Sequence, residues 1–124
     1  MSGDPVITPQ HVEQRLINLS KELDAASVEL DTCEVRFAAA KTAWEVNSAK
    51  TRIAIRGRHI DAGRKFTVSD VDDEAMVRCQ DEQQALNHAE ALVRSARGNV
   101  SRIKTQIDIT RSVGTSVRAA MELA

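Results

Sequence analysis

Two stretches of this chain place apolar residues at alternating intervals of three and four positions. The first runs from Leu19 to Ala40 and the second from Leu86 to Ile107. This spacing puts side chains on one stripe of a helix that coils around another helix. A segment with glycines and basic residues separates the two stretches, so they predict a long antiparallel two-helix hairpin. The expected intramolecular seam contains Leu19, Leu23, Leu30 and Phe37 in the first helix, and Leu86, Val93, Val100, Ile103 and Ile107 in the second.

Start and stop signals set the expected boundaries of this all-α fold. Thr8 followed by Pro9 is typical of a helix N-terminus. Thr67 with Asp70, or Ser69 with Asp72, resembles a capping box at the start of the second helix. We therefore expect a flexible tail over 1–7 and a single domain over 8–124, with helices over 8–57 and 68–112, a basic turn over 58–67 and a helical stretch over 115–123.

A turn centred near Gly63 also predicts which residues face each other across the hairpin. It pairs Leu19 with Ile107 and Leu23 with Ile103. These layers fill a dense seam, although a register shifted by one heptad gives tolerable pairs as well. Beyond Trp44 the seam positions become polar, which predicts a shift of the buried face or a local unwinding of the helix. The neighbouring positions Val46, Ala49 and Ile53 would then become buried.

The first helix carries further apolar residues away from the seam, whereas the back of the second helix is mostly polar. A lone two-helix hairpin buries one stripe per helix and is marginally stable. The surplus apolar residues therefore favour self-assembly through the first helix, most simply a dimer that forms a four-helix bundle. The alternative is scattered surface aliphatics, which are common. The candidate oligomer face is Ile17, Val28, Val35, Ala39, Val46 and Ile53.

Basic residues gather around the predicted turn and allow two interpretations. They could contact the phosphates of a nucleic acid. They could instead neutralise the acidic residues over 70–74, and this second interpretation fits the net charge of −1 better. The candidate nucleic-acid or anion contacts are Arg52, Arg56, Arg58, Arg64 and Lys65.

The composition gives little support for a catalytic, metal-binding or phosphate-binding site. The chain has two Phe, one Trp and no Tyr, which is little aromatic surface for a catalytic cleft. The three histidines are far apart and form no pair at metal-ligand spacing, and the chain lacks a glycine-rich phosphate loop. We expect no enzyme, metal or cofactor. No apolar run is long enough to span a membrane, and Cys33 and Cys79 are expected to be buried thiols in a reducing, cytoplasmic setting.

Three further segments are notable: Ala40–Trp44, Ala89–Arg94 and Ile107–Gly114, the last leading to Arg118. Through them, the chain from about Ala40 onward resembles small helical proteins of unassigned role that are encoded by tailed phages of actinobacteria. The resemblance implies a phage accessory protein, located in the host bacterial cytoplasm, and it transfers no functional residue.

These observations predict a non-enzymatic oligomeric helical protein that binds an unknown protein partner, as a host-interaction, defence-countering or assembly factor. One alternative is a nucleic-acid-binding accessory protein of phage DNA metabolism that uses the basic tip. Another is an oligomer that sequesters a small anionic ligand, with Arg94 or Arg97 at its interface.

Overall fold

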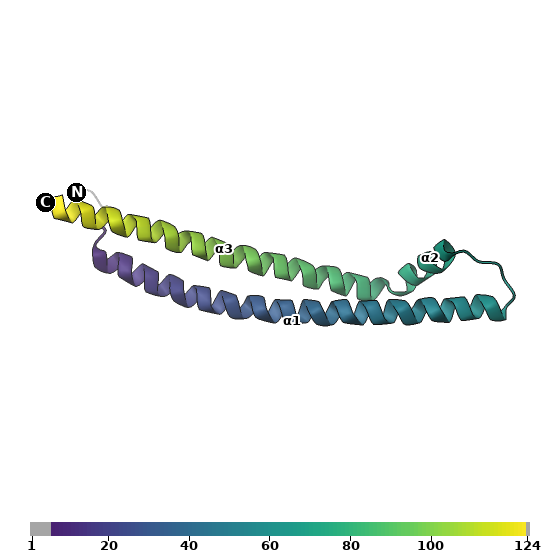
Figure 1. Ribbon diagram of the computed structural model, residues 1–124. Helices are drawn as coiled ribbons and strands as arrows, with labels where there is room; N and C mark the ends of the chain where they lie inside the picture. The colour runs from purple at the N-terminus through teal and green to yellow at the C-terminus, as the bar shows by residue number, and fades with distance from the viewer. Residues whose placement is uncertain (1–5, 124) are drawn as a thin grey trace. The chain divides into compact units, whose positions relative to one another are not determined.

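The computed structural model describes residues 6–123, and these residues form an all-α fold. Long α1 packs antiparallel against long α3, and a short helix α2 lies between them in the chain (Figure 1). The predicted helical hairpin is thus confirmed, although its second half is divided into helices at a different point than expected. The helices are α1 (Pro9–Asp61), α2 (Val68–Arg78) and α3 (Gln80–Leu123).

The described residues divide into two compact units. Unit 1 comprises 6–31 and 95–123, and unit 2 comprises 32–94. Most of the predicted tail over 1–7 lies outside the described residues. Val6 and Ile7, which are described, are exposed and not helical.

Both ends of α1 carry capping interactions. As predicted, the helix begins at Pro9, and the hydroxyl of Thr8 accepts a hydrogen bond from the N–H of His11 at 3.3 Å. The predicted end at residue 57 is wrong, because α1 continues to Asp61. The chain leaves the helix at Gly63, whose φ of 65° suits glycine. The N–H groups of Gly63 and Arg64 then donate to the last carbonyls of the helix. The glycine that ends α1 is therefore Gly63 and not Gly57.

A capping box starts α2, as the sequence predicts. The hydroxyl of Thr67 accepts from the N–H of Asp70 at 3.1 Å, and the carboxylate of Asp70 accepts from the N–H of Thr67 at 2.9 Å. Phe66 precedes the cap and packs against the cluster that contains Val71. This contact fixes how the chain enters the helix.

The expected helix over 68–112 is interrupted at Cys79, where α2 ends and α3 begins one residue later. The buried residues Val71, Ala75 and Cys79 are spaced by four, whereas the seam beyond Leu86 alternates three and four. A change of spacing turns the buried face to a different side of the helix axis. The interruption between α2 and α3 falls where this change occurs. The expected separate stretch over 115–123 is also wrong, because α3 continues through residue 114 to Leu123.

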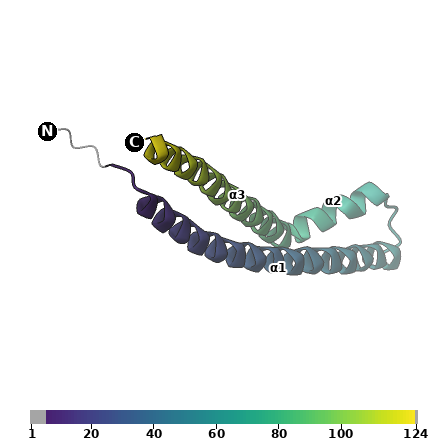
Figure 2. The same cartoon turned by 60° about the vertical axis from the view of Figure 1, so that its left-hand side comes forward.

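Unit 1 is a two-helix seam with an aliphatic core. The core cluster consists of Leu19, Ala26, Val100, Ile103 and Ile107, and Leu16, Leu23 and Leu30 pack against it. α1 and α3 lie side by side along this unit (Figure 2). Leu19 and Ile107, which the sequence pairs, both belong to the cluster, as does Ile103, against which Leu23 is expected to pack. Towards the start of α1, Val12 approaches Gly114 so closely that a Cβ added to the glycine would lie 2.9 Å from Val12 Cγ1. The predicted register, with a turn centred near residue 63, is therefore confirmed in unit 1.

Unit 2 has a smaller aliphatic cluster and a polar continuation of the seam. Ile55, Val71 and Ala75 form the cluster, and Phe66 packs against it. The predicted shift of the buried face after Trp44 is wrong. Ser48 is 5% exposed and Asn47 and Thr51 are partly buried, whereas Val46, Ala49 and Ile53 remain on the surface. The same face of α1 therefore stays buried through Ser48 and Thr51. It leads to Ile55, which packs against Val71 and Ala75 of α2.

The remaining predicted seam residues of unit 2 also face inward. Phe37 and Leu86 are partly buried, and Val93 is 4% exposed. Cys33 and Cys79 are buried free thiols, as predicted, and the Sγ of Cys79 donates to the hydroxyl of Thr51 at 3.5 Å.

Candidate interaction surfaces

The residues predicted as an oligomer face are exposed. In unit 1, Ile17 is 50% and Val28 is 66% exposed. In unit 2, Val35 is 70%, Val46 is 44% and Ile53 is 68% exposed, and Ala39 between them is exposed as well. Aliphatic side chains with this much exposure on one helix are candidates for an interface, since they gain most from burial.

In unit 2 these residues belong to a longer repeat that the sequence reading missed. Positions 32–60 of α1 contain a second series that alternates steps of three and four, on the face away from the seam. Alanine and threonine at intermediate positions hid the series, although its spacing was readable from the sequence. Ile17 does not fit this spacing. We name the series the outer stripe: Thr32, Val35, Ala39, Thr42, Val46, Ala49, Ile53, Arg56 and Ile60.

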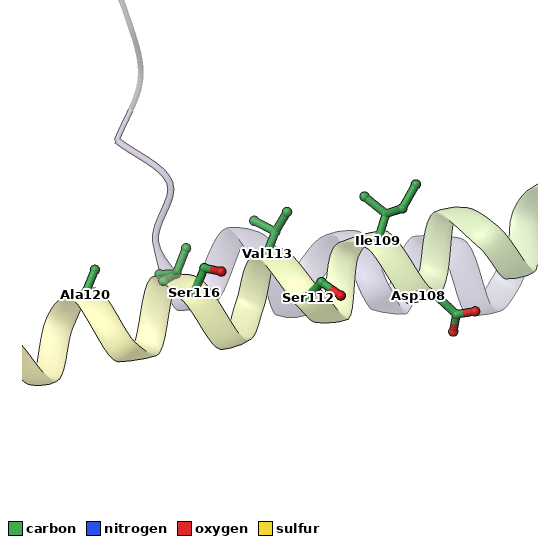
Figure 3. A pocket seen from close by; sticks show the side chains of 7 residues that line it. Asp108, Ile109, Ser112, Val113, Ser116 and Ala120 are labelled. Carbon is green, nitrogen blue, oxygen red and sulfur yellow. The ribbon is translucent and has the colours of Figure 1, made fainter.

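A shallow apolar groove lies along the outer face of α3 in unit 1. Figure 3 shows that Ile109, Val113 and Ala120 project on the same side of the helix, with Ser112 and Ser116 between them. Ile109 is 58% exposed and Val113 is 37% exposed. The groove is lined by α3 alone and is shorter than the outer stripe.

Glu74 of α2 is the centre of an ion-pair cluster in unit 2. Its Oε1 lies 2.8 Å from Nη2 of Arg58 on α1 and 2.9 Å from Nη2 of Arg78. Its Oε2 lies 3.6 Å from Nε2 of His59. The hydrogen bond from Arg58, reinforced by the charges of Arg58 and Arg78, lowers the pKa of Glu74 below its ordinary value of 4.5. This cluster joins α2 to the end of α1 within unit 2.

His59 combines this ion pair with an aromatic contact. Its ring stacks on Phe66 with the ring centroids 5.2 Å apart. Its Nδ1 is buried without a hydrogen-bond partner. The ring thus fills space between the end of α1 and the connection to α2, which is a structural role.

The structure divides the predicted basic contacts into two groups. Arg58 pairs with Glu74, and Nε of Arg52 lies 3.2 Å from Oδ1 of Asp72. These two arginines support the interpretation that basic residues neutralise the neighbouring acids. Arg56, Arg64 and Lys65 are exposed and have no ion pair among residues 6–123. Only this second group presents uncompensated charge to a partner.

Two hollows among the described residues contain polar side chains. One, of about 280 Å³ in unit 2, is lined by Trp44, Ser48, Arg52, Asp72 and Cys79 among others. The other lies in unit 1 beside Arg102, which donates to Oδ1 of Asn99 at 2.6 Å. Arg94 and Arg97, the residues considered for an anionic ligand, line neither hollow and are exposed.

No group of three or more potential metal ligands occurs among the described residues. Within 6–123, no helix combines the length and the hydropathy needed to cross a membrane. No family model, curated protein or solved structure matches this chain.

Proposed function

We propose that this chain is a non-enzymatic helical protein that assembles with itself and binds a macromolecular partner. The observation that carries the proposal is the outer stripe, which presents Val35, Ile53 and Ile60 at 65–70% exposure with coiled-coil spacing. A helix in a hairpin needs one stripe for its intramolecular partner, so a second stripe with the same spacing suits a further helix. The resemblance to phage proteins adds the hypothesis that the partner is a host or virion protein.

Molar mass in solution tests the assembly. Ile53→Glu introduces a charge into the outer stripe at an exposed position, and it is expected to reduce an oligomer to the mass of a monomer without loss of helix. Ile109→Glu is the matched control, because Ile109 is similarly exposed but lies on α3. Light scattering coupled to gel filtration, with circular dichroism, measures both variants. A wild-type protein that is monomeric at all concentrations would contradict the proposal.

A second candidate function is nucleic-acid binding through the uncompensated basic residues Arg56, Arg64 and Lys65. Replacement of all three by Ala should then weaken binding to a DNA or RNA duplex and flatten its dependence on salt. The control replaces Arg94, Arg102 and Arg118 of α3, which removes the same formal charge elsewhere. If the wild type does not bind at low salt, or if both triple variants lose binding equally, this candidate is rejected.

A further inference from the structure

Charged residues of opposite sign border the outer stripe in different parts of α1. Lys50 and Arg52 border its later half in unit 2. Glu29 and Asp31 lie in the turns of α1 that lead into the stripe. In a coiled coil, residues at such bordering positions face the bordering positions of the partner helix and choose its direction.

We propose that two copies of this chain pair through α1 in antiparallel orientation, about a two-fold axis that passes between Ala40 and Lys41. This inference rests on the proposed self-assembly and specifies its geometry. In this register Val35 of one copy faces Val46 of the other, Ala39 faces Thr42, and Thr32 faces Ala49. The two-fold symmetry repeats each of these three pairs, which gives six central layers. All six lie within unit 2 and contain no charged residue.

Charge complementarity selects this register. Glu29 of one copy faces Lys50 of the other, and Asp31 faces Arg52. Lys50 is exposed and has no ion pair among the described residues, so it is available to a second copy. Arg52 already contacts Asp72 and is 41% exposed, so Asp31 would add a second carboxylate to it. The other bordering pairs, Arg36 with Ala43 and Ala38 with Glu45, set no like charges against each other.

Other arrangements of the same two helices set like charges together. In a parallel pair, Arg56 of one copy faces Arg56 of the other copy inside the contact. An antiparallel pair shifted by one heptad towards the end of α1 sets Arg36 against Lys50 and Glu45 against Glu45. Like charges at these positions disfavour pairing.

The centre of the proposed contact is lined by small residues. Ala39 and Thr42 form its middle layers, and Ala38 and Ala43 border them. Small side chains let two helices approach closely, since the distance between helix axes depends on the side chains at the contact. The larger Val35 and Val46 then pack on either side of this close approach.

Disulfide trapping tests the direction and the register together. Val35→Cys and Val46→Cys are made separately in a protein whose Cys33 and Cys79 are replaced by Ala, and helix content and molar mass are first compared with the wild type. Oxidation of the mixed variants is expected to yield mainly the crosslink between Cys at 35 and Cys at 46, since these positions face each other. Each variant alone should remain largely uncrosslinked.

The opposite result overturns the inference. Crosslinking of each variant with itself indicates a parallel pair, and crosslinking of neither with any partner, in a protein that light scattering shows to be a dimer, indicates a different interface. Both results leave the proposed self-assembly intact, whereas a monomeric wild type removes it.

A charge exchange provides a second measurement that needs no cysteine. Glu29→Lys and Lys50→Glu should each raise the dimer dissociation constant by roughly three- to tenfold. The double variant should return it towards the wild-type value, because the antiparallel register restores opposite charges at both sites. Additive loss in the double variant would contradict the proposed register.

Discussion

The two units use the same α1 and α3 in different ways. Unit 1 packs branched aliphatic residues such as Leu19, Val100 and Ile103 across a regular seam. Unit 2 has a cluster of three buried residues, continues its seam through Ser48 and Thr51, and joins α2 to α1 by ion pairs. Its α1 segment nevertheless exposes several aliphatic side chains.

This difference indicates where each unit obtains its stability. Burial of apolar surface is the main favourable contribution to folding. In unit 1, this surface is buried between α1 and α3 of the same chain. Unit 2 also buries apolar residues along its seam, but several of them are small, such as Cys33, Ala75 and Ala89. It adds the cap of α2, the ion pairs of Glu74 and, in our proposal, apolar burial against a second copy.

Truncation of the seam of unit 1 should cause the largest loss of stability. Leu19 is fully buried, so Leu19→Ala should lower the free energy of unfolding by about 2–5 kcal/mol. Ile17→Ala, two residues away and half exposed, should change it by less than about 1 kcal/mol. Urea unfolding followed by circular dichroism at one protein concentration measures both. Equal losses would contradict the burial of Leu19 in the aliphatic core of unit 1.

Loss of the cap of α2 should weaken unit 2 by an intermediate amount. Thr67→Ala removes the hydroxyl that accepts from Asp70 and should cost about 1 kcal/mol. Fluorescence of the single Trp44, which lies in unit 2, follows this change. Thr105→Ala is the control, because the hydroxyl of Thr105 donates within α3 to the carbonyl of Ser101 and alanine is a better helix former. A larger loss in the control would argue against the role of the cap.

Glycine substitutions should distinguish open helix surface from close contact. Gly98→Ala and Gly57→Ala each add a methyl group with no atom within 4 Å, so each should stabilise its helix by about 0.5–1 kcal/mol. Gly114→Ala should gain nothing or lose stability, because the new Cβ would lie 2.9 Å from Val12 Cγ1. Thermal unfolding midpoints rank the three variants. A stabilising Gly114→Ala would mean that unit 1 tolerates a wider separation of its helices.

Protonation of Glu74 should have the smallest effect, and its direction follows from the lowered pKa. A lowered pKa in the folded state contributes stability above the ordinary value of 4.5 and loses it as the pH falls through the lowered value. Glu74→Gln should therefore be less stable than the wild type at neutral pH. The difference should vanish in acid well below pH 4.5, which thermal unfolding across pH measures. A difference that persists in acid would assign the loss to packing.

The regular parts of the fold were predictable from the sequence. The alternating spacing identified the seam from Leu19 to Ile107, and local caps at Thr8 and Thr67 marked two helix starts. Such signals lie within a few residues of their effect, so a single sequence contains them. The close approach of Val12 to Gly114 also follows from the predicted register.

The mistaken predictions involve competition between local signals and packing. Gly57 and Gly114 weaken a helix, but backbone hydrogen bonds and neighbouring turns keep both positions helical. The polar residues Ser48 and Thr51 face inward because Ile55 and Val71 hold that side of α1 against α2. The sequence predicted that basic residues neutralise the acids over 70–74, but the particular pair of Arg58 with Glu74 depends on how α2 folds back onto α1 within unit 2.

The positions of the two buried thiols provide a probe that needs no substitution. Cys33 and Cys79 both belong to unit 2, and they are the two cysteines of the chain. A thiol reagent can react with a buried cysteine only when the surrounding structure opens, so the rate of alkylation reports the frequency of local opening. Mass spectrometry of the labelled peptides would separate opening of the seam at Cys33 from opening of the helix junction at Cys79. Protection of both thiols that increases with protein concentration would link local breathing of unit 2 to assembly.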